Sequence, residues 1–213
     1  RTLSVLKNKD DIIARLNVLA DSYASWIQEK LVEDSKMADK KFREEIGNDI
    51  INKCVEALNR IRAGIQLLVE DAVVFDAFCF MNRAMILQRN IMNFSKKHGA
   101  GIECAFRDFV DPRNPSNNFG WRPFQIAFIL MNLKGIVDPE HDNREVVDLL
   151  YFPTGGGKTE AYLGLMAFVI ANRRLRADEN DEYNRDGGVT AILRYTLRLL
   201  TTPVSYTHLT LPT

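Results

Sequence analysis

Hydrophobic residues recur at helical spacing through most of the first hundred positions. Over residues 12–31, apolar side chains stand three or four positions apart with Asp and Lys between them, which is typical of an amphipathic helix. A second such pattern covers residues 42–68, and a third, over residues 73–94, is apolar on nearly every side. No proline precedes Pro112, so we expect long helices. We predict a helical bundle with the third helix at its centre.

The pattern changes after residue 110. Residues 111–120 read DPRNPSNNFG, and prolines and asparagines at this density mark a loop. A helical pattern follows over residues 121–133. We therefore place a domain boundary here, with a helical domain over residues 1–110 and the start of a second domain over residues 111–203.

The second domain alternates between strand and helix signals. Residues 146–152 form a short apolar run that suits a buried parallel strand, and residues 188–194 offer a second strand. Between them, residues 159–173 are rich in Leu, Met, Phe and Ile without proline, which favours a helix. This order predicts the opening of a RecA-like α/β domain. With so few strands, we expect it to expose apolar sheet edges and to be poorly stable alone.

A glycine-rich segment joins the first predicted strand to its helix. Glycines let backbone N–H groups approach phosphate oxygens, and the helix N-terminus adds a positive dipole end. Lys158 can reach the β- and γ-phosphates of a nucleotide, and the Thr159 hydroxyl can coordinate Mg²⁺. We therefore expect ATP and Mg²⁺ as cofactors. The predicted cofactor-binding residues of this segment are Thr154, Gly155, Gly156, Gly157, Lys158, Thr159 and Glu160.

The phosphate-loop pattern has one departure. Phe152 stands where the general pattern has its first glycine, although Pro153 to Thr159 match the form found in superfamily 2 helicases. The alternative is a glycine turn that merely links a strand to a helix. The flanking strand and helix signals favour the nucleotide site.

Arg122 and Gln125 lie upstream in the sequence Arg-Pro-Phe-Gln. In many superfamily 2 enzymes a similar sequence reads adenine, because a Gln amide offers both a donor and an acceptor to the base. The alternative is a helix N-terminus with Pro123 in its first turn and Phe124 packed inward. Its place before the phosphate loop favours the adenine role.

Basic and hydroxyl side chains follow the second predicted strand. We expect Arg194, Thr196 and Arg198 to contact the sugar–phosphate backbone of DNA, because superfamily 2 helicases place such contacts at this position. The alternative is an amphipathic helix with solvated arginines.

Composition excludes little. The formal net charge is zero, so a nucleic-acid surface would have to be a local patch. No run approaches the roughly 18 apolar residues of a membrane span. Three widely spaced cysteines indicate a reducing, cytoplasmic location. Residues 204–213 read VSYTHLTLPT, which looks like a translated sequencing adapter rather than a natural polar terminus, so we leave them out of the functional reasoning.

Three segments together resemble the helicase-like DrmA family of DISARM anti-phage defence systems. They are WRPFQ at residues 121–125, LLYFPTGGGKTEAYLGL at 149–165 and GGVTAILRYTLRLLT at 187–201. The resemblance implies an ATP-driven DNA helicase or translocase that acts with other defence subunits. It assigns phosphate and Mg²⁺ binding to Lys158 and Thr159, and adenine to Gln125. In that family a Gln pair, an Asp-Glu box and a second RecA-like domain would follow, so we expect little or no turnover from these residues alone.

Two other functions remain open. One is a P-loop ATPase that does not act on nucleic acid, whose turnover DNA would not stimulate. The other is a non-enzymatic assembly module with a degenerate phosphate loop, whose partner binding would survive Lys158→Ala. The basic segment near Arg194 argues against the first alternative.

Overall fold

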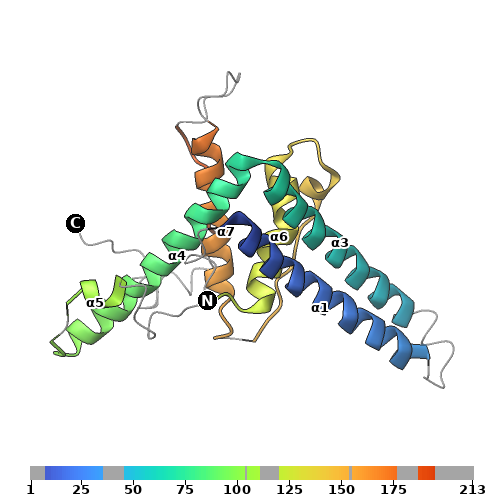
Figure 1. Cartoon of the computed structure of the whole chain (residues 1–213), viewed down its shortest axis with the longest axis horizontal. Coiled ribbons are helices and arrows are strands. Elements are labelled where there is room, and N and C mark those ends of the chain that lie inside the picture. Colours follow the sequence, from blue (N-terminus) through green and yellow to red (C-terminus); the bar gives the residue numbers. More distant parts are fainter. Residues whose placement is uncertain are drawn as a thin grey trace.

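The computed structural model describes residues 8–35, 46–103, 105–110, 120–153, 155–176 and 187–194. Within these ranges the regular structure is helical, and no residue is assigned to a strand. The helices are α1 (Lys9–Ser35), α3 (Asn48–Glu70), α4 (Ala72–Gly99), α5 (Arg107–Val110), α6 (Pro123–Val137), the 3₁₀ turn η4 (Asp142–Glu145) and α7 (Lys158–Leu175) (Figure 1).

The long helices pack in pairs. Helices α1 and α3 run side by side in antiparallel directions (Figure 1), and α6 also packs against α3. Helix α4 packs chiefly against α7, which also contacts α6. The helix that follows the phosphate loop is therefore held between a helix of the N-terminal region and α6.

One hydrophobic core joins all five long helices. Its fully buried side chains include Ile27 of α1, Leu68 of α3, Phe78 of α4, Leu130 of α6 and Phe168 of α7. Burying side chains of this size contributes roughly 1.5–3 kcal/mol each. The N-terminal helices and the α6–α7 pair thus share apolar contacts that stabilise both.

A single extended residue separates α3 from α4. Asp71 has φ −115° and ψ 112°, and its carboxylate accepts a hydrogen bond from the Val74 N–H at 3.0 Å, which caps the N-terminus of α4. The same carboxylate pairs with Arg176 at the C-terminal end of α7. Burial raises the pKa of Asp71, but the Val74 hydrogen bond and the Arg176 charge outweigh it, so its pKa is lowered.

Replacing Asp71 with alanine is expected to lower the free energy of unfolding by about 1–2 kcal/mol, because a helix cap and an ion pair are both lost. The lowered pKa means that this contribution is complete above the ordinary value of 3.8 and is lost as pH falls through the folded-state value. Urea unfolding at neutral pH and in acid measures both effects. The exposed Asp76 of the same helix serves as the control, and an equal loss in Asp76→Ala would contradict the cap assignment.

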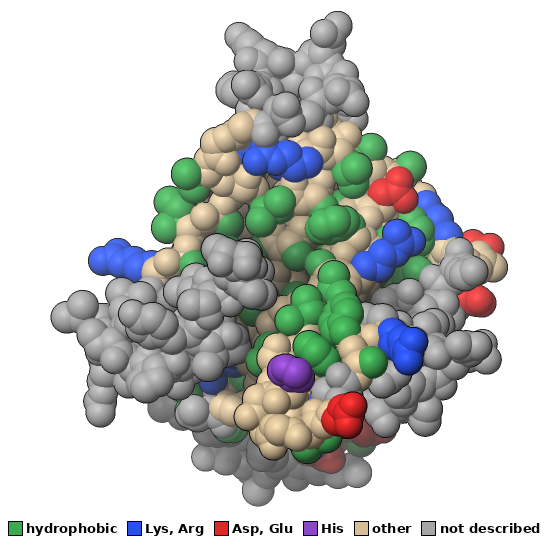
Figure 2. All heavy atoms as spheres, turned by 90° about the vertical axis from the view of Figure 1, so that its left-hand side faces the viewer, with side chains coloured by type: hydrophobic (Ala, Val, Ile, Leu, Met, Phe, Trp, Pro, Cys, Tyr) green, Lys and Arg blue, Asp and Glu red, His purple; other side chains and the backbone are tan. Residues whose placement is uncertain are grey.

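The helical bundle predicted from the sequence is confirmed. Each predicted helical pattern falls on a helix of the structure, namely α1, α3, α4, α6 and α7. Helix α4 is central only over its first half, where Val74, Phe78 and Met81 are buried. Its later residues Leu87, Ile91 and Met92 are substantially exposed. Figure 2 shows hydrophobic side chains between Lys and Arg side chains on the face turned towards the α5 end of the molecule.

The prediction of two strands is wrong for the described residues. Residues 146–152 and 188–194 carry no strand assignment, and a strand is stable only when neighbouring strands satisfy its backbone. Residues 146–152 nevertheless keep the exposure pattern of a strand, since Val147, Leu149 and Tyr151 are 93%, 88% and 90% exposed while the residues between them are partly buried. These apolar side chains are therefore exposed, but no sheet forms among the described residues, so the predicted exposure of sheet edges stays a prediction.

An ion pair fixes the chain just before the phosphate loop. Both terminal nitrogens of Arg60 on α3 donate to the Asp148 carboxylate, at 2.8 and 2.6 Å. Arg60 is buried and Asp148 largely so, and a paired geometry of this kind is the strong form of the Arg–carboxylate interaction. Helix α3 thereby anchors the segment that leads into the loop.

Candidate nucleotide-binding site

The glycine segment forms a tight loop that ends at the N-terminus of α7. Gly155 and Gly157 have φ of 77° and 90°, in the left-handed region that favours glycine. Gly157 is the N-cap of α7, and Lys158 is its first residue. The first-turn N–H groups of any helix lack intrahelical partners. The loop therefore directs backbone donors and a helix dipole towards the same point.

Two of the three loop glycines, Gly156 and Gly157, are closely packed. A Cβ atom at Gly156 would lie 2.3 Å from Cδ1 of Phe152, and one at Gly157 would lie 2.6 Å from Nε2 of Gln125. Both distances are shorter than real Cβ contacts. Packing against Phe152 and Gln125 therefore favours glycine at these two positions.

Helix α6 holds the loop from one side. The Arg122 guanidinium donates to the Gly156 carbonyl oxygen at 2.8 Å, and the Gln125 side-chain amide donates to the Gly157 carbonyl oxygen at 2.7 Å. The Gln125 side-chain oxygen accepts from the Arg122 N–H at 2.8 Å. The two residues predicted to read adenine thus lie directly against the phosphate loop.

These contacts give Gln125 a positioning role. The residue is only 5% exposed, and its amide oxygen and nitrogen each make one hydrogen bond within the protein. A Gln amide has two donors and two acceptor positions, so one of each remains for a base. Adenine recognition by Gln125 stays a prediction. Pro123 also occupies the first turn of α6, as the alternative interpretation expected.

Lys158 points back to the chain that precedes the loop. Its ammonium group donates to the carbonyl oxygen of Phe152 and, at 3.3 Å, to that of Pro153. The Phe152 ring stacks on Phe124 with centroids 4.1 Å apart, which explains how the loop accommodates Phe152 in place of glycine. The lysine spans the loop where its ammonium group can exchange carbonyl oxygens for phosphate oxygens.

A cavity of about 330 Å³ lies beside the loop. Its walls include Gly155, Gly157 and Glu160 on one side and Trp121 and Gln125 on another. Asn82, Met85 and Arg89 of α4 complete the lining. Small-molecule sites have volumes from about 300 Å³ upward, so the space suits part of a nucleotide.

Sequence reasoning missed the contribution of α4. The side-chain oxygen of Asn82 accepts a hydrogen bond from the Trp121 indole N–H at 2.8 Å, and Arg89 lies 3.8 Å from the Glu160 carboxylate. In the sequence these two residues read only as polar interruptions of an apolar helix. The single available signal is their seven-residue spacing, which places both on one helix face.

The remaining predicted site residues are only partly placed. Thr159 is exposed in the first turn of α7, and Arg194 is exposed in the described segment 187–194. Thr154, Thr196 and Arg198 lie outside the described residues. The structure therefore brings Arg122, Gln125 and the loop together. The DNA contacts of Arg194, Thr196 and Arg198 stay predictions.

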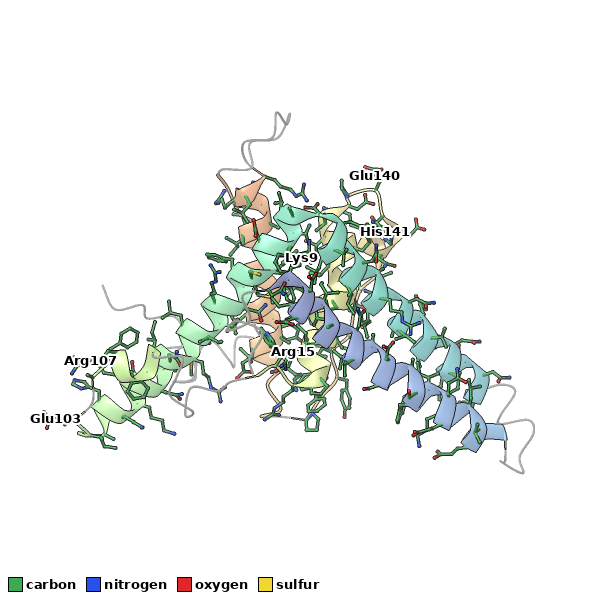
Figure 3. The ribbon with its side chains drawn as sticks, viewed as in Figure 1. Lys9, Arg15, Glu103, Arg107, Glu140 and His141 are labelled. Atoms are coloured by element: carbon green, nitrogen blue, oxygen red, sulfur yellow. The ribbon has the colours of Figure 1, made fainter. Side chains whose placement is uncertain are left out.

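Several ionisable groups in the part of the chain that the structure describes lie far from one another. Figure 3 shows Glu103 and Arg107 by α5, and Glu140 and His141 in the loop after α6, at separate ends of the molecule. Among the described residues, no group of three His, Cys, Asp or Glu side chains could hold a metal ion. No helix in the described ranges is long and apolar enough to cross a membrane.

Comparison with known proteins shows what the chain is similar to. No protein-family profile matches the chain. Over 195 residues the chain is 48% identical to a protein of Bacillus paralicheniformis named DISARM protein DrmA, and the alignment covers 90% of this chain and 16% of that protein. The chain is therefore similar to DrmA over most of its own length. It spans about one sixth of the length of the DrmA protein it matches.

The similarity to DrmA includes the candidate site. Only about a tenth of the chain lies outside the alignment, and the loop at residues 155–160 lies far from both ends of the chain. The helical region, α6 and α7 therefore all have counterparts in DrmA. The name of that protein connects DrmA with DISARM.

Proposed function

We propose that the chain is the ATP-binding portion of a superfamily 2 DNA helicase or translocase that acts in anti-phage defence. The observation that carries the proposal is the loop at residues 155–159. Two left-handed glycines place Lys158 at the start of α7, and Arg122 and Gln125 bind the loop carbonyls from α6. The similarity to DISARM protein DrmA supports the defence role.

The residues of the loop fit a nucleotide with Mg²⁺. Gly156 and Gly157 pack closely against Phe152 and Gln125, which keeps the loop backbone compact at the start of α7. The first-turn N–H groups of α7 bind phosphate oxygens, Lys158 neutralises their charge, and the exposed Thr159 hydroxyl is available to Mg²⁺. ATP supplies the phosphoryl group that is transferred to water. Because such transfer depends on positioning and charge, the rigid support from α6 matters as much as the lysine.

The proposed DNA contacts lie beyond the loop. Arg173 of α7 donates to the carbonyl oxygens of Gly187 and Val189, at 2.7 and 2.9 Å. These bonds tie the start of the segment that carries Arg194 to the helix that follows the loop. We propose that Arg194, with Thr196 and Arg198, binds the phosphate backbone of DNA, so that events at the loop reach the DNA contacts through α7. Other defence subunits and a cytoplasmic location belong to the same proposal.

DNA dependence separates this function from its alternatives. We expect the full-length protein to hydrolyse ATP in the presence of Mg²⁺, and DNA to raise the rate severalfold. The measurement is steady-state phosphate release with and without single- and double-stranded DNA. Turnover that DNA does not change would favour a P-loop ATPase of another kind, and binding of a defence subunit without nucleotide binding would favour an assembly module.

A further inference from the structure

We infer that Arg89, on helix α4 of the N-terminal region, binds the terminal phosphates of the nucleotide. The inference rests on the proposed function, because it assumes that the loop holds a nucleoside triphosphate. Arg89 and Glu160 line the same cavity as Gly155 and Gly157. A residue far from the phosphate loop in sequence thereby takes part in nucleotide binding.

One face of α4 is turned towards the cavity. Asn82, Met85, Ile86 and Arg89 all line it, and they occupy positions i, i+3, i+4 and i+7 of the helix, which lie on one side. The helix is fixed there by the buried Phe78 and Met81 and by the Asn82–Trp121 hydrogen bond. The position of Arg89 therefore follows from packing about two to three turns earlier in the same helix.

The Arg89 guanidinium already faces an anion at this place. Its Nη1 atom lies 3.8 Å from Oε1 of Glu160, in the first turn of α7. The other carboxylate oxygen of Glu160 lies beside the loop, 3.3 Å from where a Cβ of Gly157 would stand. Phosphates bind at such helix N-termini, so the carboxylate and the phosphates of a nucleotide compete for the same cation.

The Arg89 guanidinium is expected to bind the phosphates of a nucleotide in preference to the Glu160 carboxylate. The side chains of Arg89 and Glu160 are 47% and 38% exposed, and ion pairs this accessible contribute little to stability. Their separation also exceeds the roughly 2.7–2.9 Å of a strong charge-assisted hydrogen bond. A triphosphate carries several negative charges and offers two oxygens to the planar guanidinium. The Glu160 carboxylate is therefore a weak competitor for Arg89, and a phosphate adds a bidentate contact.

The test compares nucleotide affinities of four variants of the full-length protein. ATP and AMP are titrated with Mg²⁺ against a fluorescent ATP analogue for Arg89→Ala, Glu160→Gln, the double variant and Arg83→Ala. Arg83 is exposed on the same helix but does not line the cavity, which makes it the matched control. We expect Arg89→Ala to weaken ATP binding about tenfold or more, to change AMP binding less than about twofold, and Arg83→Ala to change neither.

Glu160→Gln distinguishes a phosphate contact of Arg89 from a purely structural role of that residue. Removing the competing carboxylate is expected to tighten ATP binding about twofold to fivefold when Arg89 is present. The same substitution should have no such effect in the Arg89→Ala background. Melting temperatures of all variants check that folding is intact.

The outcomes separate this inference from the proposed function. If Lys158→Ala loses ATP binding but Arg89→Ala does not, the role of Arg89 is wrong and the nucleotide site stands. Equal weakening of ATP and AMP by Arg89→Ala also overturns the phosphate contact. If the unaltered protein binds no ATP, the proposed function fails and this inference fails with it.

Discussion

Replacing Lys158 with alanine is expected to lower ATP hydrolysis by the full-length protein at least about 100-fold, the scale on which a single charge-stabilising group acts in a transition state. Lys158 is the cation at the start of α7, next to glycines whose left-handed conformation turns the backbone towards a ligand. Without it, the charge on the transferred phosphoryl group loses its main counter-charge in the loop. Steady-state phosphate release with saturating DNA measures the effect.

The control must separate charge from folding. Lys158 also donates hydrogen bonds to the carbonyl oxygens of Phe152 and Pro153, so its loss could loosen the loop. The exposed Lys53, which pairs only along its own helix with Asp49 at 2.7 Å, provides a lysine-to-alanine control. Activity that survives in Lys158→Ala while the melting temperature is unchanged would contradict the assignment of the loop.

The second large effect is expected at Gly64, where α3 crosses α6. A Cβ atom at Gly64 would lie 2.1 Å from the carbonyl oxygen of Leu130 and 2.9 Å from its carbon. Both are backbone atoms, so no side chain can turn aside, and the two helices must move apart. We expect Gly64→Ala to lower the free energy of unfolding by about 3 kcal/mol, the upper part of the range for overpacked cores.

Gly99→Ala, at the end of α4, serves as the control for Gly64→Ala. At Gly99, the last residue of α4, a Cβ atom would meet nothing within 4 Å. Gly99→Ala should therefore be neutral or slightly stabilising, since alanine is the better helix former. Urea unfolding of both variants measures the difference. A Gly64→Ala protein as stable as Gly99→Ala would mean that α3 and α6 do not pack at this distance.

The helices could be predicted because their signal is local. Apolar residues at a 3.6-residue period record which face is buried, whatever lies against it. The half-exposed α4 shows the limit of this signal, since residues such as Leu87 and Ile91 are apolar yet exposed. Sequence gives the composition of a helix face but not the surface that covers it.

The strands could not be predicted in the same way. Residues 146–152 have the composition of a buried strand, but strand formation depends on partners elsewhere in the chain. What holds this segment is the pair between Arg60 and Asp148, which lie 88 positions apart. No local pattern marks such a pair, because either residue alone reads as a solvated charge.

Part of the candidate site could be predicted from local sequence, and part depends on tertiary packing. The loop was predictable, because three glycines before Lys158 and Thr159 have a known physical use. The proximity of Arg122 and Gln125 to the loop was expected from the order of motifs, and their hydrogen bonds to the Gly156 and Gly157 carbonyl oxygens were not. The wall formed by α4 depends on how α4 packs against α7, which only the three-dimensional structure gives.

The most direct test of the account is an experimental structure of the full-length protein with Mg²⁺ and a non-hydrolysable ATP analogue. We predict phosphates bound at the first turn of α7, with Lys158 moved from the Phe152 carbonyl oxygen to the β- and γ-phosphates and the Thr159 hydroxyl on Mg²⁺. A nucleotide bound elsewhere, or a loop that stays empty with Lys158 still on the carbonyl oxygens at saturating analogue, would contradict the central claim that this loop is a nucleotide site.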